Sequence, residues 1–156
     1  MKTVRERSLH LIDIENLAGS PSPSVDEVGW YHLAYEALHV GPGDHVVIAC
    51  SRHAARSVRW GWPTRRHLWR SGNDGADLAL LEVIARERVA ECFNFVVLAS
   101  GDGIFTDAVA RLGSQGVEVT VVSRPESLSR SLRMAAKHHI LFPYPPTELG
   151  MLGTPA

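Results

Sequence analysis

Three aspartates lie where an apolar run of the sequence gives way to a helix-like pattern. Asp13 ends the run in LHLID, Asp77 stands in GNDGADLALLEVI, and Asp102 follows VVLASG. Carboxylate oxygens are the ligands that hard divalent cations such as Mg²⁺ and Mn²⁺ prefer. Two carboxylates in close proximity repel each other unless a cation lies between them. The three acids therefore predict a metal site if the fold brings them together.

Each aspartate also has an explanation that needs no site, because Asp is favoured at helix starts. If Asp74 is an N-cap, Asp77 is the third residue of a helix, where the helix dipole stabilises an acid. Asp102 in SGDG has the same ambiguity. Taken one at a time, the three acids are more readily explained as helix-start residues, whereas their shared position at strand-to-helix junctions favours a site.

Short apolar runs alternate with helical patterns along the chain. The runs predict buried strands near residues 9–14, 45–50, 93–99 and 117–122, and shorter strands near 67–69 and 138–142. The patterns predict helices near 25–38, 74–89, 104–112 and 127–137, the first capped by Ser24. Apolar strands separated by helices are typical of a parallel sheet covered on both faces. The sequence thus predicts an α/β fold, a single-domain three-layer sandwich with a mainly parallel central sheet of Rossmann type.

Such a sheet binds ligands at the carboxyl ends of its strands, near the change in strand order. Asp13 and Asp102 follow two predicted strands and so share this edge. Neighbouring strands are about 4.8 Å apart, so the two acids are close if their strands are adjacent. Gly101 and Gly103 are expected to let the backbone turn tightly between strand and helix.

The composition fits one globular domain. The chain has 156 residues, 45% of them hydrophobic, and a net charge of −1, so its overall charge points to no partner. Residues 51–73 differ, because arginines alternate there with Trp60, Trp62 and Trp69 and no acid is present. This segment suits a phosphate backbone and unstacked bases. A solvated arginine face with tryptophans in the core, or a dimer interface, explains it as well.

Several classes of function lack their sequence signals. Cys50 and Cys92 have no CxxC spacing and are expected to be reduced core residues, and no GxSxG or strand-following GxGxxG occurs. A phosphatase of the haloacid dehalogenase type would need Asp two residues after Asp13, where Glu15 stands. No histidine is assigned a catalytic role. No apolar stretch is long enough for a signal sequence or a membrane span, so we expect a soluble cytoplasmic protein.

Three blocks of the sequence resemble the NYN domain family, part of the PIN-like nuclease superfamily. They are LIDIENL, GADLALLEVI and VVLASGDGIFTDAVARLGSQGVEVTVVS, and the resemblance extends from about residue 8 to about residue 141. The resemblance implies site residues Asp13 and Asn16 in the first block, Asp77 in the second, and Ser100, Gly101 and Asp102 in the third. It also implies a PIN-like fold and a ribonuclease or RNA-processing activity with Mg²⁺ or Mn²⁺ held by the carboxylates.

The chain departs from the family pattern at one position. Many family members have a second Asp two residues after the Asp of SGD, and Ile104 stands there in this sequence. Asp107 lies three residues further on and is a candidate metal ligand in its place, or an ordinary exposed helix acid. The departure leaves open whether one metal ion or two are bound.

The predicted function is a metal-dependent ribonuclease with a domain over residues 1–142 and a Pro/Gly-rich tail over 143–156. The metal ligands would be Asp13, Asp77 and Asp102, with Asp107 as a further candidate, and Asn16 would orient a ligand or a water. RNA would be bound by Ser100, Arg65, Arg66, Arg70, Arg124 and Arg130. The alternative is a catalytically weak or inactive module of the same fold that binds RNA or protein. The sequence is compatible with both a monomer and a homo-oligomer.

Overall fold

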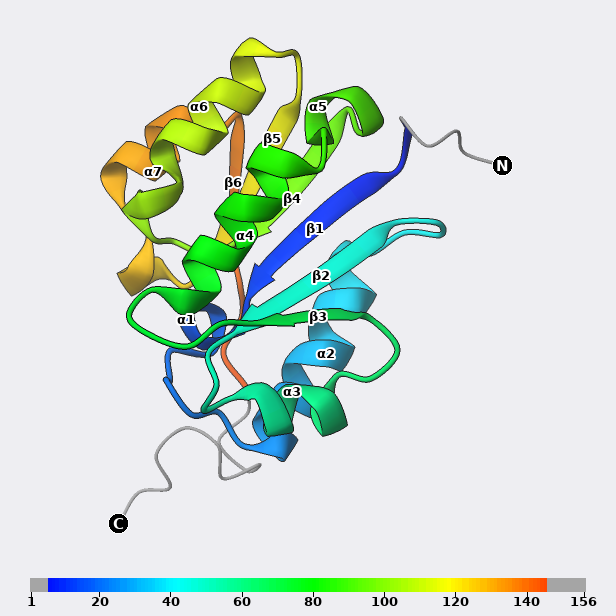
Figure 1. Cartoon of the computed structure of the whole chain (residues 1–156), viewed down its shortest axis with the longest axis vertical. Coiled ribbons are helices and arrows are strands. Elements are labelled where there is room, and N and C mark those ends of the chain that lie inside the picture. The colour runs from blue at the N-terminus through cyan, green and yellow to red at the C-terminus, as the bar shows by residue number, and fades with distance from the viewer. Residues whose placement is uncertain (1–5, 146–156) are drawn as a thin grey trace.

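The computed structural model describes residues 6–145, in which a six-stranded sheet lies between two layers of helices (Figure 1). The strands are β1 (Ser8–Asp13), β2 (His45–Cys50), β3 (Arg66–Trp69), β4 (Phe95–Ala99), β5 (Glu118–Ser123) and β6 (His138–Leu141). The α-helices are α1 (Ile14–Ala18), α2 (Val25–His39), α3 (Ala55–Gly61), α4 (Gly75–Arg86), α5 (Val89–Cys92), α6 (Thr106–Ser114) and α7 (Arg130–Ala135), and 3-10 helices η2 (Gly103–Phe105) and η3 (Pro125–Ser127) precede α6 and α7.

The sheet is parallel throughout. Its order is β3-β2-β1-β4-β5-β6, so the chain first extends the sheet on one side of β1 and then returns to extend it on the other. This is the strand order of a Rossmann-type sheet, with its change of direction between β1 and β4. The prediction of a mainly parallel α/β sandwich is confirmed.

Each face of the sheet has its own apolar core, which explains why the strands are apolar at successive positions. On one face, Leu11 and Leu98 pack with Leu80 of α4 and Val109 of α6. On the other face, the core includes Ile12 and Ile48 of the sheet, together with Tyr31 and Tyr35 of α2 and Val58 and Trp62 around α3.

Local signals explain where some elements begin and end. The Ser24 hydroxyl accepts a hydrogen bond from the Glu27 N–H at 3.1 Å, and the Glu27 carboxylate accepts one from the Ser24 N–H, so the expected cap of α2 is confirmed as a capping box. Asp74 stands at the N-cap position of α4, as the alternative explanation of Asp77 requires, but its φ is 57° and its side chain makes no capping hydrogen bond.

Three predicted segments differ in their bounds. The helix expected over 74–89 is interrupted near Arg88, whose φ is 52°, and continues as the short helix α5. The helix expected over 127–137 is limited to α7, after the 3-10 turn η3. The first strand ends at Asp13, where α1 begins at once. Of the tail expected over 143–156, residues 146–156 lie outside the described residues.

Candidate functional site

The candidate site lies at the carboxyl ends of β1 and β4, where the strand order changes direction. These two strands are neighbours, and Ile12 pairs with Ala99 in their register. The next residues are Asp13 on one strand end and Ser100 on the other, so the first and third sequence blocks meet here. A parallel sheet of this order binds its ligands in this crevice.

Asp13 and Asp77 form a buried pair of carboxyl groups. Asp13 is 5% exposed and Asp77, in the first turn of α4, is 6% exposed. Their side chains interact, and this interaction is one of the causes that shift both pKa values. Burial, followed by the bond and the charge of Asp77, raises the pKa of Asp13 well above its usual range. Burial also raises the pKa of Asp77.

The Oδ1 atoms of the two carboxyl groups differ in their partners. Asp13 Oδ1 accepts a hydrogen bond of 3.2 Å from the Asn16 N–H and so caps α1. Asp77 Oδ1 is buried and has no hydrogen-bond partner. A helix-start role therefore accounts for part of what Asp13 does and leaves the Asp77 carboxylate unexplained, because a buried polar atom without a partner is costly.

Asp102 lies on the loop after β4. It is half-buried, and its Oδ1 accepts a hydrogen bond of 2.9 Å from the Ile104 N–H, so it caps the 3-10 turn η2. The negative charge of Asp102 also raises the pKa of Asp77, as do the charges of Asp74 and Glu15. Acidic groups thus gather around the Asp13–Asp77 pair.

Two residues of the blocks hold this loop in place. The side-chain oxygen of Asn16 accepts a hydrogen bond of 2.9 Å from the Gly101 N–H. The hydroxyl of Ser100, which is fully buried, accepts one of 3.2 Å from the Asp102 N–H. The sequence predicts that Ser100 binds substrate, and the structure places it beneath the loop with its hydroxyl directed to the backbone.

Close backbone contacts explain the glycines at the site. A Cβ at Gly101 would overlap the backbone carbonyl of Ser127, and one at Gly75 would overlap the carbonyl oxygen of Arg70. Gly101 and Gly103 are not among the residues with positive φ. Glycine is needed at position 101 because the backbone of Ser127 lies too close for a Cβ atom. The tight turn that the sequence suggests is not the main reason.

The donor set fits a hard divalent cation in part. Among residues 6–145, no group of three or more His, Cys, Asp or Glu residues that could hold a metal ion is present as the side chains stand. The Asp13–Asp77 pair nevertheless supplies oxygen donors only, with one buried oxygen lacking a partner, and this is the chemistry that Mg²⁺ and Mn²⁺ take. A cation between the two carboxyl groups would offset the repulsion between their negative charges.

Asp107, the further candidate ligand, lies apart from this pair. It is exposed in the first turn of α6 and lines a groove between α4 and α6, together with Ile84 and Arg111. Ile104, which stands where the family has a second Asp, is 37% exposed and lines the same groove.

The predicted RNA-binding arginines are divided between the two edges of the sheet. Arg65 and Arg66 lie at the start of β3, toward the edge opposite the carboxylates. Arg65 donates hydrogen bonds to Glu36 from Nε at 3.1 Å and from Nη2 at 2.6 Å, and Arg66 donates two to Glu87 at 2.6 and 2.7 Å. The structure does not bring these two arginines to Asp13.

The other three arginines follow strands or loops at the carboxyl edge. Arg70 comes directly after β3 and is 3.4 Å from Glu82. Arg124 donates a hydrogen bond of 2.7 Å to the carbonyl of Ala18, also pairs with Glu126, and is only 15% exposed, so it anchors the end of α1. Arg130 is exposed and follows Ser129, whose N–H donates to the Gly101 carbonyl at 2.8 Å.

A parallel sheet between two layers of helices, with acidic residues at its switch point, is consistent with the PIN-like nuclease fold. The model of the NYN domain family, a PIN-like nuclease family, matches residues 65–143, which is about half of the chain. The chain therefore belongs to the NYN domain family. The matched segment contains Asp77 and Asp102, and the fold adds Asp13 and Asn16 from outside it.

The fold is also found in a solved structure. The chain is similar to a protein of unknown function from Vibrio parahaemolyticus, with a TM-score of 0.56 and 19% sequence identity over 90% of this chain and 95% of that one. This likeness shows the fold alone. A comparison with curated proteins gives no match. Among the helices of the described residues, none has the length and apolar character that crossing a membrane requires.

Proposed function

We propose that this protein is a metal-dependent ribonuclease whose site is built on Asp13, Asp77 and Asp102. The observation that carries the proposal is the buried Asp13–Asp77 pair with an unpartnered carboxylate oxygen, at the switch point of a nuclease-family fold. Two buried carboxyl groups in contact reduce the stability of the folded chain, and a bound cation offsets that cost.

Mg²⁺ or Mn²⁺ held there would lower the pKa of a bound water and stabilise the negative charge that develops on a scissile phosphate. The protein side chains have separate tasks. Asp13 and Asp77, which are fixed by burial, would supply two of the carboxylates. Asp102, half-buried on the loop after β4, would supply the third.

RNA would approach this edge along its basic residues. Arg130 lies at the carboxyl edge with an exposed side chain, and it suits a phosphate oxygen. Asn16 acts as a positioning residue, because its side-chain oxygen holds the Gly101 N–H and so fixes the loop that carries Asp102.

A module that binds RNA without cutting it is the second candidate. Two observations favour it: Ile104 replaces an acid, and no group of three metal-binding residues is preassembled within the described part of the chain.

Cleavage of a mixed RNA pool distinguishes the two. Purified protein with Mn²⁺ or Mg²⁺ is expected to cut RNA, and EDTA or the Asp102→Asn variant is expected to abolish cutting. Asp26→Asn, which removes an exposed acid from the first turn of α2, is the matched control and should cut normally. A folded protein that neither cuts RNA nor binds Mn²⁺ by calorimetry would rule out the nuclease and leave the binding module.

A further inference from the structure

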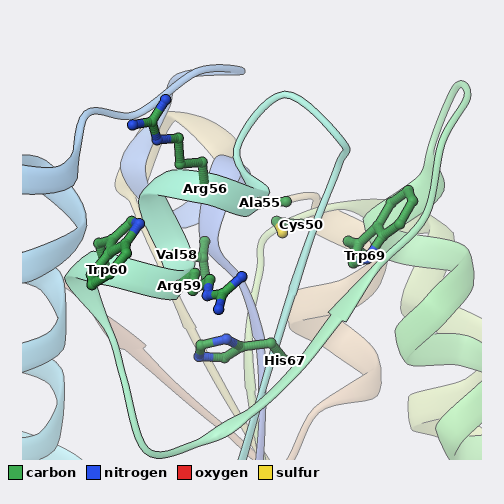
Figure 2. Close-up of a pocket in the computed structure, with 8 residues that line it drawn as sticks. All are labelled: Cys50, Ala55, Arg56, Val58, Arg59, Trp60, His67 and Trp69. Carbon is green, nitrogen blue, oxygen red and sulfur yellow. The ribbon is translucent and has the colours of Figure 1, made fainter.

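A pocket of about 540 Å³ lies between α3 and β3, and the proposed mechanism does not use it. Figure 2 shows Trp60 and Trp69 on opposite sides of this pocket, with Arg59 and His67 between them. Its volume is within the range of about 300 to 1,000 Å³ that small-molecule sites occupy. None of the described residues that line it is acidic.

The tryptophans of this region have different roles. Trp62 is fully buried in the core and donates a hydrogen bond of 2.8 Å from its ring nitrogen to Glu36. Trp60 is 66% exposed and Trp69 is 61% exposed, so the core does not account for either of them. Large exposed aromatic rings beside a pocket are suited to stacking on a planar ligand, and every nucleobase has a face that can stack on them.

The arginines of this pocket differ from those nearby in their ion pairs. In the part of the chain that the structure describes, no carboxylate lies within ion-pair distance of Arg56 or Arg59, and Arg59 lies 6.0 Å from the centre of the Trp60 ring. A second pocket, on the α4 side of β3, also contains arginines, but Glu82 and Glu87 pair with them. Of these two pockets, the α3–β3 pocket is therefore the better suited to an anion.

His67 adds a directed polar group. Its Nε2 is 2.6 Å from the carbonyl oxygen of Trp62, and because a carbonyl only accepts, this nitrogen carries the proton. Nδ1 of the neutral ring then remains as an acceptor for a base amine or imino N–H.

The pocket adjoins the carboxyl edge of the sheet at Cys50. This residue lines the pocket and follows Ala49, which pairs with Asp13 in the β1–β2 register. Cys50 packs with the core on the α2 and α3 face, and Asp13 contacts Asp77 on the α4 face. An RNA strand that crosses the end of β2 would reach both places.

We propose that the α3–β3 pocket is a nucleobase subsite, in which an unpaired base stacks on Trp69 or Trp60 while Arg56 and Arg59 bind the adjoining phosphates. The inference rests on the proposed ribonuclease function, because that function supplies RNA as the occupant. A base inside a duplex is stacked and paired, so the subsite requires an unpaired segment.

Binding without cleavage tests the subsite. The probe is a short fluorescein-labelled uridine oligomer in EDTA, measured by fluorescence anisotropy, either alone or annealed to its complement. Trp69→Ala is expected to weaken binding of the single strand by about 5- to 100-fold, because stacking on an aromatic side chain accounts for that range per base. Trp69→Phe keeps a stacking ring and is expected to retain most of the affinity.

The arginines are tested by the salt dependence of binding. The double variant Arg56→Gln/Arg59→Gln is expected to lower the slope of log affinity against log salt by about 1.4, which is about 0.7 for each phosphate of a single strand that is no longer neutralised. The control is Arg86→Gln/Arg111→Gln, which removes two exposed arginines from the helices on the other face and should leave the slope unchanged.

The outcomes separate this inference from the proposed function. Wild-type affinity in both Trp69→Ala and the Arg56/Arg59 variant would overturn the subsite, and metal-dependent cutting by the same proteins would leave the nuclease in place. Loss of binding in both variants would support the subsite even if the wild-type protein never cuts RNA. A change in sedimentation from dimer to monomer in Trp69→Ala, with RNA affinity unchanged, would overturn it in favour of an interface between copies.

Discussion

The side-chain oxygen of Asn16 accepts a hydrogen bond of 2.9 Å from the backbone N–H of Gly101, and this bond joins helix α1, which follows β1, to the loop after β4 across the switch point of the sheet. Asn16 is in the first turn after Asp13, and Gly101 directly precedes Asp102. Two acids that are far apart in the sequence are thereby held at a fixed separation.

Removal of this bond should weaken both stability and activity. Asn16→Ala leaves the buried Gly101 N–H without a partner, and we expect a loss of about 1 to 3 kcal/mol in the free energy of unfolding. RNA cleavage should fall with it, because the position of Asp102 is no longer fixed. Urea unfolding and cleavage rates check this. Asn73→Ala, in an exposed loop, is the control and should change the free energy of unfolding by less than about 0.5 kcal/mol.

Replacement of Asp77 should separate stability from function. Asp77→Asn removes one of two buried, mutually repelling carboxyl groups, so we expect the metal-free protein to gain about 0.5 to 2 kcal/mol in the free energy of unfolding. In the wild-type protein, Mn²⁺ should raise Tm, and at 100 times Kd this corresponds to about 2.7 kcal/mol. The variant should lose that shift. Thermal unfolding with and without Mn²⁺ measures both effects, and a less stable variant that still responds to Mn²⁺ would contradict the proposed site.

Asp107 should be dispensable for cleavage. Its carboxylate is exposed and lies in the groove between α4 and α6, away from the Asp13–Asp77 pair. We expect Asp107→Asn to cut RNA at close to the wild-type rate while Asp13→Asn loses about 100-fold or more, the size of effect seen when an electrostatic group of an active site is removed. Equal losses in the two variants would instead make Asp107 a ligand.

Gly101 and Gly113 should respond to replacement by alanine in opposite directions. Gly101→Ala places a methyl group against the Ser127 carbonyl, which cannot yield without moving the backbone, and we expect a loss of about 1 to 3 kcal/mol. Gly113→Ala, near the end of α6, meets no atom within 4 Å and should gain about 0.5 to 1 kcal/mol through helix propensity. Thermal unfolding of the two variants tests the assignment, and destabilisation by Gly113→Ala would count against it.

The sequence predicts those parts of the fold that depend on local patterns. The Ser24-x-x-Glu27 capping box and the apolar runs of the strands each depend on a few consecutive residues, and both are present in the structure. Helix α1 has five residues, which are too few for a periodic pattern. The break at Arg88 depends on a positive φ, which an arginine does not signal. Neither of these two features could therefore be predicted from local patterns.

Long-range pairing decides which arginines are available to a ligand, and the sequence holds little information on it. The Arg- and Trp-rich composition of residues 51–73 predicts RNA contacts for Arg65 and Arg66, but Glu36 and Glu87, which lie at distant positions, neutralise them. Arg56 and Arg59 are three residues apart in helix α3, and both line the pocket. That spacing is the one available signal for the pocket they line with Trp60 and Trp69.

A histidine in the core should destabilise the folded chain as the solution is acidified below about pH 6.5. His10 is fully buried, with its Nδ1 2.7 Å from the Tyr35 hydroxyl and its Nε2 3.0 Å from Asp44. Burial lowers the pKa of His10 below its usual value of 6.5, and the bond and charge of Asp44 offset this only in part. Burial likewise lowers the pKa of His39.

Below pH 6.5 the unfolded chain therefore binds protons that the folded chain does not, and stability is lost as pH falls toward the folded pKa, by at most about 1.4 kcal/mol per pH unit for each such histidine. Asp44, whose pKa is lowered, adds its own loss only at more acidic pH. Asp13 and Asp77, whose pKa values are raised, act in the opposite direction, because the folded chain binds their protons first. Urea unfolding between pH 7.5 and about pH 5 therefore compares the wild-type protein with His10→Gln, in which the contribution of His10 to the loss of stability should be absent. A pH dependence that is unchanged in the variant would show that the pKa of His10 is not lowered in the folded chain.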